Sequence, residues 1–220
     1  MNKNALKFGV MIFSVALAAG LAGLWLAAMY GEGESQAILL PDQVITVFPD
    51  PKPLAAFALA DQQNQPFDLA RLKGRWSFIF FGFTHCPDVC PTTLAVLARA
   101  HASIAKSEFG AKDVQFVFIS VDPNRDTAGT LEKYVDYFDP SFLGVTGDNV
   151  QIANLAGQLD AKYQVTVTPG EENYPVYHTT AVFLIDPRAR YRAVFTPPHD
   201  PEAISRRFEL VRQLEPGSAS

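Results

Sequence analysis

Two hydrophobic patterns alternate along most of this chain. Continuous apolar runs of strand length predict strands that are buried on both faces. Segments in which apolar residues recur every three or four positions predict helices with one buried face. The predicted strands are residues 76–81, 114–121, 177–185 and 191–195, and the predicted helices are residues 91–109, 127–138, 150–160 and 201–214.

The order of these elements predicts an α/β fold. A long helix separates the strands at 76–81 and 114–121, and such a crossover is typical of parallel neighbours in one sheet. The strands at 177–185 and 191–195 are close in sequence, so they are expected to form an antiparallel hairpin. We therefore expect a central sheet with helices on both faces.

The N-terminal region carries a different apolar pattern. Residues 8–30 contain no charge, and a helix of these 23 residues would be about 35 Å long, enough to cross a hydrocarbon core of about 30 Å. Lys3 and Lys7 precede this run, whereas Glu32 and Glu34 are the first charges after it. The positive-inside rule then predicts a single-pass transmembrane anchor with its N-terminus in the cytoplasm.

This anchor determines the expected cellular location of the protein. The short basic start lacks the Arg-rich and Ser-rich character of a mitochondrial transit peptide, which favours the bacterial plasma (inner) membrane with a periplasmic C-terminal domain. A cleaved signal peptide is the alternative, because small residues lie within the run. The expected organisation is a cytoplasmic N-terminus at 1–7, the anchor at 8–30, a proline-rich linker at 31–53, one domain at 54–215 and a disordered tail at 216–220.

Composition excludes some function classes. The chain has 220 residues, of which 48% are hydrophobic, so it is expected to fold rather than remain disordered. Its 18 Lys and Arg against 23 Asp and Glu give a formal charge of −5, which argues against a nucleic-acid partner bound through phosphates.

The candidate chemistry lies where the first predicted strand leads into the first helix. Cys86 and Cys90 are the two cysteines of the chain, in the segment FGFTHCPDVCPTTL. With helical spacing, their Cα atoms would lie roughly 6 Å apart, which allows a disulfide or a shared ligand. Pro91 places the expected helix start just after Cys90, where the helix N-terminus would stabilise a thiolate.

Two thiolates are soft ligands that favour copper(I), zinc or iron–sulfur groups, and a third donor is expected from a histidine. His178 begins a predicted strand, and His85 is the second candidate because it adjoins Cys86. His101 lies mid-helix, where a surface role is expected, and His199 lies in a turn. The residues alone leave the third donor open.

The segments GRWSFIFFGFTHCPDVCPTTL, SVDPNRDTAGTLEKYVDYFDPSFLGVTG and YHTTAVFLIDP together resemble the Sco/SenC family of membrane-anchored assembly factors for cytochrome c oxidase. The resemblance implies a thioredoxin-like fold and a copper ion bound by Cys86, Cys90 and His178. It implies the copper-site subunit of the oxidase as a partner, with an upstream copper donor or a thiol reductant beside it. Two departures concern turns: Ala128 stands where the family often has Pro, and the segment DPRAR lacks the usual Gly.

Three other residues near the motif have alternative interpretations. Asp122 is either an acidic neighbour of the site or a cap for the turn through Pro123 and Asn124, and capping is the favoured interpretation. Asp88 is expected on the exposed tip between the cysteines. Phe83 is expected to pack in the core or rim, with a docking contact as the alternative.

Four functions fit the cysteine pair. A copper metallochaperone for the oxidase is the favoured hypothesis. A thiol–disulfide oxidoreductase would use Cys86 and Cys90 as a redox-active catalytic pair, although its usual motif is CxxC rather than CxxxC. A peroxiredoxin is disfavoured because Pro87 stands where that motif has Thr, and a purely structural disulfide is the remaining possibility.

Overall fold

The computed structural model describes residues 38–39, 45–167 and 174–214, all within one compact unit, Gln36–Ser220. The predicted cytoplasmic segment, the anchor at 8–30 and the tail at 216–220 lie outside the described residues. Among the described helices, none combines the length and apolar character needed to cross a membrane.

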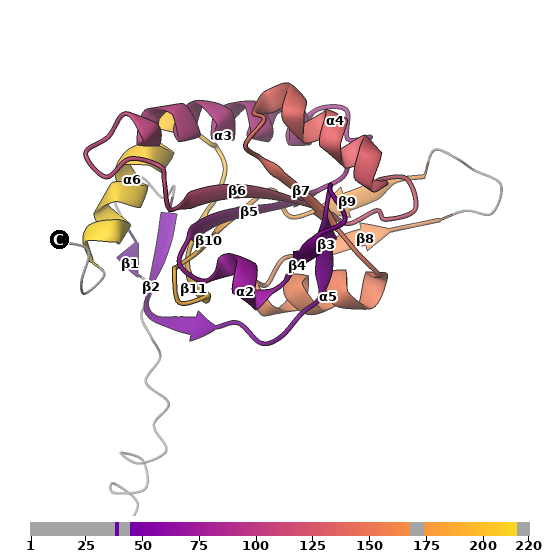
Figure 1. Cartoon of the computed structure of the whole chain (residues 1–220), viewed down its shortest axis with the longest axis horizontal. Helices are drawn as coiled ribbons and strands as arrows, with labels where there is room; N and C mark the ends of the chain where they lie inside the picture. Colours follow the sequence, from indigo (N-terminus) through magenta and orange to yellow (C-terminus); the bar gives the residue numbers. More distant parts are fainter. Residues whose placement is uncertain (1–37, 40–44, 168–173, 215–220) are drawn as a thin grey trace, which may run out of the picture. The chain divides into compact units, whose positions relative to one another are not determined.

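The described part of the domain is built on one mixed sheet of nine strands, in the order β1-β2-β11-β10-β5-β6-β7-β3-β4 (Figure 1). The predicted parallel pair is present at the centre of the sheet: β5 (Trp76–Gly82) pairs with β6 (Val114–Ser120). On its other side, β6 pairs in parallel with β7 (Leu143–Thr146), a strand that the hydrophobic pattern did not predict. β5 and β6 are buried along their whole length, because helices cover both faces. The side chains of β5 and β6 therefore lie in the core. A ligand-binding site is expected just beyond the carboxyl ends of these parallel strands.

The C-terminal hairpin is also as predicted. β10 (Val182–Ile185) pairs antiparallel with β11 (Arg190–Phe195) and, on its other side, with β5. Apart from β2 (Ile45–Pro53), the strands that the hydrophobic pattern did not predict have only two to four residues: β1 (Ile38–Leu39), β3 (Leu59–Asp61), β4 (Pro66–Phe67), β7 and β8 (Tyr163–Val165).

The sheet extends into the predicted linker. β2 occupies residues 45–53 and pairs with β11, although the sequence prediction started the domain at Leu54. Prolines 49, 51 and 53 exclude helix, as expected, but a strand tolerates proline where the ladder is interrupted. The β2–β11 register shifts between Tyr191 and Ala193, and this irregularity accommodates the proline-rich part of β2.

Helices cover the two faces of the sheet and enclose two cores. On one face, α3 (Val89–Ala105), α4 (Ala128–Phe138) and α6 (Pro201–Gln213) pack on Phe78, Phe80 and Phe118. On the other face, α2 (Leu69–Leu72) and α5 (Asn149–Gln158) pack on Ile79 and Phe81 (Figure 1). The long helices match their predicted ranges within a few residues.

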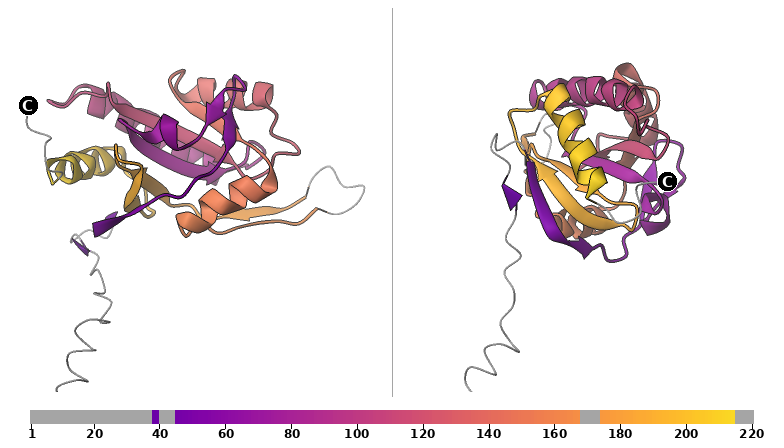
Figure 2. Two further views of the ribbon diagram at one scale, coloured as in Figure 1. Left: turned by 60° about the horizontal axis from the view of Figure 1, so that its bottom comes forward. Right: turned by 90° about the vertical axis from the view of Figure 1, so that its left-hand side faces the viewer.

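The predicted strand 177–185 is divided between two sheets. Its first part is β9 (Val176–His178), which pairs with β8 (Tyr163–Val165) in a separate two-stranded ribbon, and its second part is β10. The ladder ends at Thr179: its N–H still donates to the carbonyl of Lys162, but the Lys162 N–H donates to the Thr179 hydroxyl, and the Thr179 carbonyl accepts from His178 instead. Figure 2 shows this ribbon projecting from the rest of the described domain. The division places His178 at the end of the ribbon rather than inside the central sheet.

The missing glycine of the segment DPRAR has a structural consequence. Ala189, in the turn between β10 and β11, has a φ of +58°, a left-handed conformation that glycine adopts without steric cost. The turn forms nevertheless, because Asp186 accepts hydrogen bonds from the N–H groups of Arg188 and Arg190. The departure from the family pattern therefore leaves the hairpin intact.

Candidate metal centre

The two cysteines lie at the carboxyl end of β5, where the chain turns into α3. α3 begins at Val89, so the prediction that it begins after Cys90 was wrong by two residues. Pro91 is tolerated in the first turn, since the N–H it lacks has no partner inside the helix there. Cys90 lies in this first turn and is fully buried, whereas Cys86 lies in the preceding loop and is half-buried.

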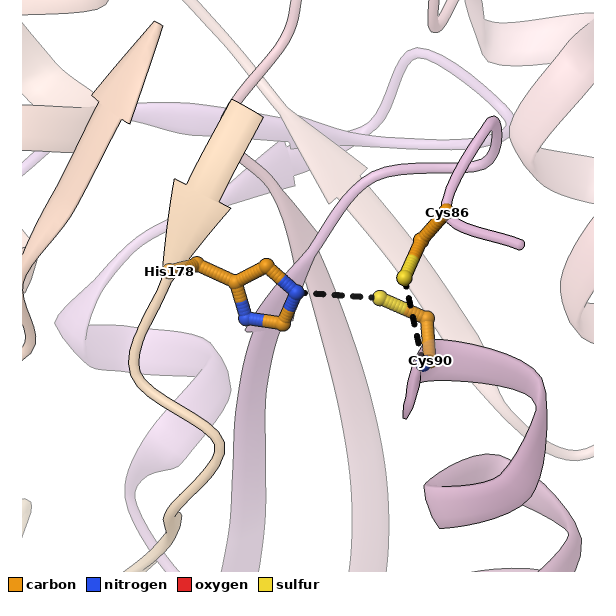
Figure 3. A group of neighbouring side chains, drawn as sticks. All are labelled: Cys86, Cys90 and His178. Carbon is orange, nitrogen blue, oxygen red and sulfur yellow. Dashed lines mark hydrogen bonds between the residues drawn. The ribbon is translucent and has the colours of Figure 1, made fainter. Parts of the chain in front are cut away.

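The fold brings three soft or borderline donors to one point. The sulfurs of Cys86 and Cys90 and a ring nitrogen of His178 all lie within 4.8 Å of one another (Figure 3). Metal–donor bonds of about 2.0–2.3 Å separate the donors of a trigonal site by roughly 3.5–4 Å. A movement of less than about 1 Å would therefore close the three donors around one ion, and no other His, Cys, Asp or Glu of the described residues joins this cluster.

The hydrogen bonds of His178 prepare its outer nitrogen for a metal. Nδ1 lies 3.0 Å from the carbonyl oxygen of Thr179, and because a carbonyl only accepts, Nδ1 carries the proton. Nε2 then keeps its lone pair, and it lies 3.3 Å from the sulfur of Cys90. A carbonyl that fixes the tautomer in this way is common behind metal-binding histidines.

Burial determines the protonation states of this site. It raises the pKa of the Cys90 thiol, with the neighbouring Cys86 sulfur and the Asp126 carboxylate adding to the rise. The expectation that the helix N-terminus stabilises a Cys90 thiolate is therefore wrong for the metal-free protein, because the loss of solvation outweighs it. Burial also lowers the pKa of His178, so its imidazole is neutral. The Cys90 thiol donates its proton toward Nε2, and a metal cation would replace that proton.

The other three histidines lie away from the cluster. His85 is half-exposed and contacts the hydroxyl of Thr84 at 3.1 Å, so the second ligand candidate turns away from Cys86. His199 lies 2.7 Å from the carbonyl oxygen of Thr180 through Nε2. His101, expected on the surface, is half-buried, and its Nδ1 is hydrogen-bonded to Asp139, because its helix packs against the loop after α4.

Asp126 fixes the loop that carries Cys86. Its carboxylate is fully buried and accepts hydrogen bonds from the N–H and the hydroxyl of Thr84, at 2.9 and 2.5 Å, and from the hydroxyl of Ser120. These bonds join the loop after β5 to the loop after β6. Asp126 stands in the segment SVDPNRDT, but no local pattern marks its role, since its partners lie 42 and 6 positions away.

A second set of contacts attaches the His178 ribbon to the cysteine loop. Asp122 accepts a hydrogen bond from the hydroxyl of Tyr174 at 2.6 Å and forms an ion pair with Arg125. The Arg125 guanidinium lies 3.8 Å from the ring centroid of Tyr174 and 5.7 Å from that of Phe83. We call Asp122, Arg125 and Tyr174 the clasp. The Asp122 side chain thus serves the clasp, and the favoured prediction that it caps the turn through Pro123 and Asn124 was wrong.

Phe83 and Asp88 complete the surroundings of the site. Phe83 is buried, and its ring lies edge-on to His178 with centroids 5.9 Å apart, so it packs on the ligand candidate and does not form an exposed docking contact. Asp88 is exposed before α3, as predicted, and its side chain makes no capping bond.

Loosening the clasp is expected to weaken metal binding. Tyr174→Phe removes the buried hydrogen bond to Asp122 and should cost about 1–2 kcal/mol of stability. Because Tyr174 precedes β9, we expect His178 to be held less firmly and the affinity of the site for a soft metal ion to fall several-fold, measured by competition with a chelator. Tyr177→Phe, on the same ribbon, is the control because that side chain is exposed. Equal affinities for both variants would mean that the clasp does not position His178.

The chain is similar to known proteins over most of the described domain. A family model described as SCO1/SenC matches residues 49–212. A SCO2-like protein of Rickettsia felis is 32% identical over 205 residues, which cover 93% of this chain and 96% of that protein.

Solved structures give the same result. Arabidopsis thaliana ScoI with copper bound is 31% identical, with a TM-score of 0.67 over 73% of this chain and 98% of that chain. Bradyrhizobium japonicum ScoI with copper bound is 33% identical, with a TM-score of 0.64 over 72% of this chain and 99% of that chain. The thioredoxin-like α/β fold implied by the sequence resemblance is therefore confirmed for the described domain.

Proposed function

This chain belongs to the SCO1/SenC family, and from that premise we propose that it binds one copper ion through Cys86, Cys90 and His178. We further propose that it delivers this ion to the copper centre of cytochrome c oxidase during assembly. The copper-site subunit of the oxidase is then the acceptor, and an upstream copper donor loads the site. Copper is the cargo in this scheme, while the protein supplies the ligands.

The convergence of two sulfurs and a neutral imidazole within 4.8 Å carries this proposal. Thiolate and imidazole donors favour copper(I) over hard cations such as Mg²⁺ or Ca²⁺. Three protein donors are fewer than the four of a closed structural zinc site. Because Cys86 is half-buried, a thiolate of an acceptor protein can approach the ion from its side. Such a site suits an ion that is received and released.

Copper stoichiometry tests the ligand set. The reduced protein is expected to bind one copper(I) per chain, whereas His178→Ala should lower the affinity by at least about tenfold, since one of three donors is lost. His85→Ala is the matched control, because His85 is half-exposed and faces Thr84. In cells that lack their own copy, His178→Ala should reduce oxidase activity and His85→Ala should not. Normal copper binding and normal assembly with His178→Ala would contradict the proposal.

A thiol–disulfide oxidoreductase that reduces the cysteines of the target copper site is the second candidate. Two observations favour it: both cysteines are free, and they are in contact, since the N–H of Cys90 donates a hydrogen bond to the sulfur of Cys86 at 3.4 Å. His178→Ala separates the two functions, because it removes a copper ligand and leaves both thiols in place. If this variant supports oxidase assembly while Cys86→Ser does not, the thiol function is the essential one.

We also propose a location, based on the charge-free segment at 8–30 and its flanking lysines. The chain is expected to be anchored in the bacterial plasma membrane with the copper-binding domain in the periplasm. The full-length chain should stay with the membrane after a high-salt wash and become sensitive to protease when the outer membrane is opened. A shortened chain in the periplasmic fraction would instead indicate a cleaved signal peptide.

A further inference from the structure

A basic pocket lies at the end of the sheet opposite to the candidate metal centre. It has a volume of about 480 Å³ and is lined by residues around the amino ends of β5 and β6, including Arg75 and Val114. Cys86 and Cys90 follow the carboxyl end of β5, so the length of the strand separates the two places. The pocket volume lies in the range of about 300–1,000 Å³ that is typical of small-molecule sites.

The charges that line this pocket have one sign. Arg71, Lys73 and Arg75 belong to its lining, and no acidic residue does. Arg71 is paired with Asp61 at 3.3 Å, but no ion pair found in the described part of the chain involves Lys73 or Arg75. In a chain with a formal charge of −5, this is a local concentration of uncompensated positive charge. Such a concentration attracts an anion and holds it through charge-assisted hydrogen bonds.

His101 adds an oriented imidazole ring to the same lining. Its Nδ1 lies 2.8 Å from a carboxylate oxygen of Asp139, and the hydroxyl of Ser141 also bonds to Asp139. Asp139 therefore holds the ring at Nδ1, and Nε2 is the atom left for another partner. Ser141 and Gln115 complete the polar part of the lining.

We propose that this pocket binds a small oxyanion with at least two negative charges, either a polycarboxylate or a phosphate compound. A guanidinium group matches the two oxygens of a carboxylate or phosphate, and Arg71 and Arg75 offer two such groups around one cavity. Lys73 supplies a flexible third charge. A neutral or cationic ligand would leave the charges of Lys73 and Arg75 uncompensated, so the lining selects against it. This site is separate from copper binding and does not depend on it.

Calorimetric titration of the full chain in detergent with citrate and with inorganic phosphate tests this inference, at an ionic strength held constant with NaCl. Citrate, phosphate or both should bind saturably at one site per chain, and the tighter of the two identifies the ligand class. Lys73→Gln with Arg75→Gln should weaken that binding by at least about tenfold, because two charge-assisted contacts are lost. Lys133→Gln with Arg206→Gln is the matched control, since both side chains are exposed, lie outside the pocket lining and give the same change in net charge.

The control double variant should bind within about twofold of the wild type, because Debye screening reduces the effect of distant exposed charges. Equal weakening in both double variants would mean that net charge alone drives binding, and it would overturn the proposal. The absence of saturable binding of either anion would also overturn it. Copper stoichiometry should remain unchanged in both double variants, so this test and the test of the copper function fail independently.

Discussion

Oxidation of Cys86 and Cys90 to a disulfide is expected to abolish copper binding, and reduction is expected to restore one copper(I) per chain. Forming the S–S bond removes one proton and one electron from each thiol, and the added oxidant takes the two electrons. Neither sulfur can then become the thiolate that binds the ion. Only Nε2 of His178 would remain of the proposed ligands. If each donor contributes about 3 kcal/mol, the affinity falls by more than about 1000-fold.

The measurement is copper(I) affinity by chelator competition without oxygen, on protein that has been oxidised, reduced, or oxidised and reduced again. Cys86→Ser is the control, because it removes one sulfur without permitting a disulfide and should show no response to the oxidant. Copper retained by the fully oxidised protein would show that the proposed ligand set is wrong.

The same ligands imply that binding weakens as the pH falls. Burial raises the pKa of the Cys90 thiol, so at neutral pH copper(I) must displace a proton from it, and the apparent affinity should fall about tenfold per pH unit for each displaced proton. Burial lowers the pKa of His178, so its imidazole adds to this slope only below that lowered pKa. A pH-independent affinity would be inconsistent with thiolate ligands.

Local patterns in the sequence predict those elements of the fold whose type and pairing follow from neighbouring stretches of the chain. The parallel β5–β6 pair, the β10–β11 hairpin and the long helices follow from hydrophobic periodicity and connection length. The strand β2 was missed because its pairing with β11 depends on residues more than 130 positions away, and its prolines resemble a linker. The continuous apolar run 177–185 contains no sign that the ladder ends at Thr179.

The candidate site shows the same limit. The spacing of Cys86 and Cys90 is visible in the sequence, but the choice of His178 came from family resemblance. His178 lies 88 positions from Cys90 along the chain, and only folding brings the two side chains together. The clasp was not predicted, since Tyr174 lies 52 positions from Asp122. The raised pKa of Cys90 was missed because burial, unlike helix capping, leaves no local mark in the sequence.

Gly82, the last residue of β5, is expected to be essential for the metal centre. A Cβ atom at this position would lie 2.7 Å from the sulfur of Cys90 and 2.6 Å from a ring carbon of Phe118, closer than packed atoms approach. Both neighbours are fully buried, so neither can move without disturbing the core. Gly82→Ala should therefore cost about 1–3 kcal/mol of stability and displace the Cys90 sulfur from the cluster.

The displacement distinguishes a metal-centre effect from ordinary overpacking. Gly144→Ala is the matched control, because its Cβ would lie 3.0 Å from Leu131 and 3.3 Å from Val135 on α4, away from the cysteines. Both variants should lower the midpoint of chemical denaturation, but only Gly82→Ala should lower copper(I) affinity, by at least about tenfold, since one of three donors is moved. If folded Gly82→Ala protein binds copper as tightly as Gly144→Ala protein, the buried position of the Cys90 sulfur does not determine binding. A group outside this cluster would then have to replace the Cys90 sulfur as a donor to the ion.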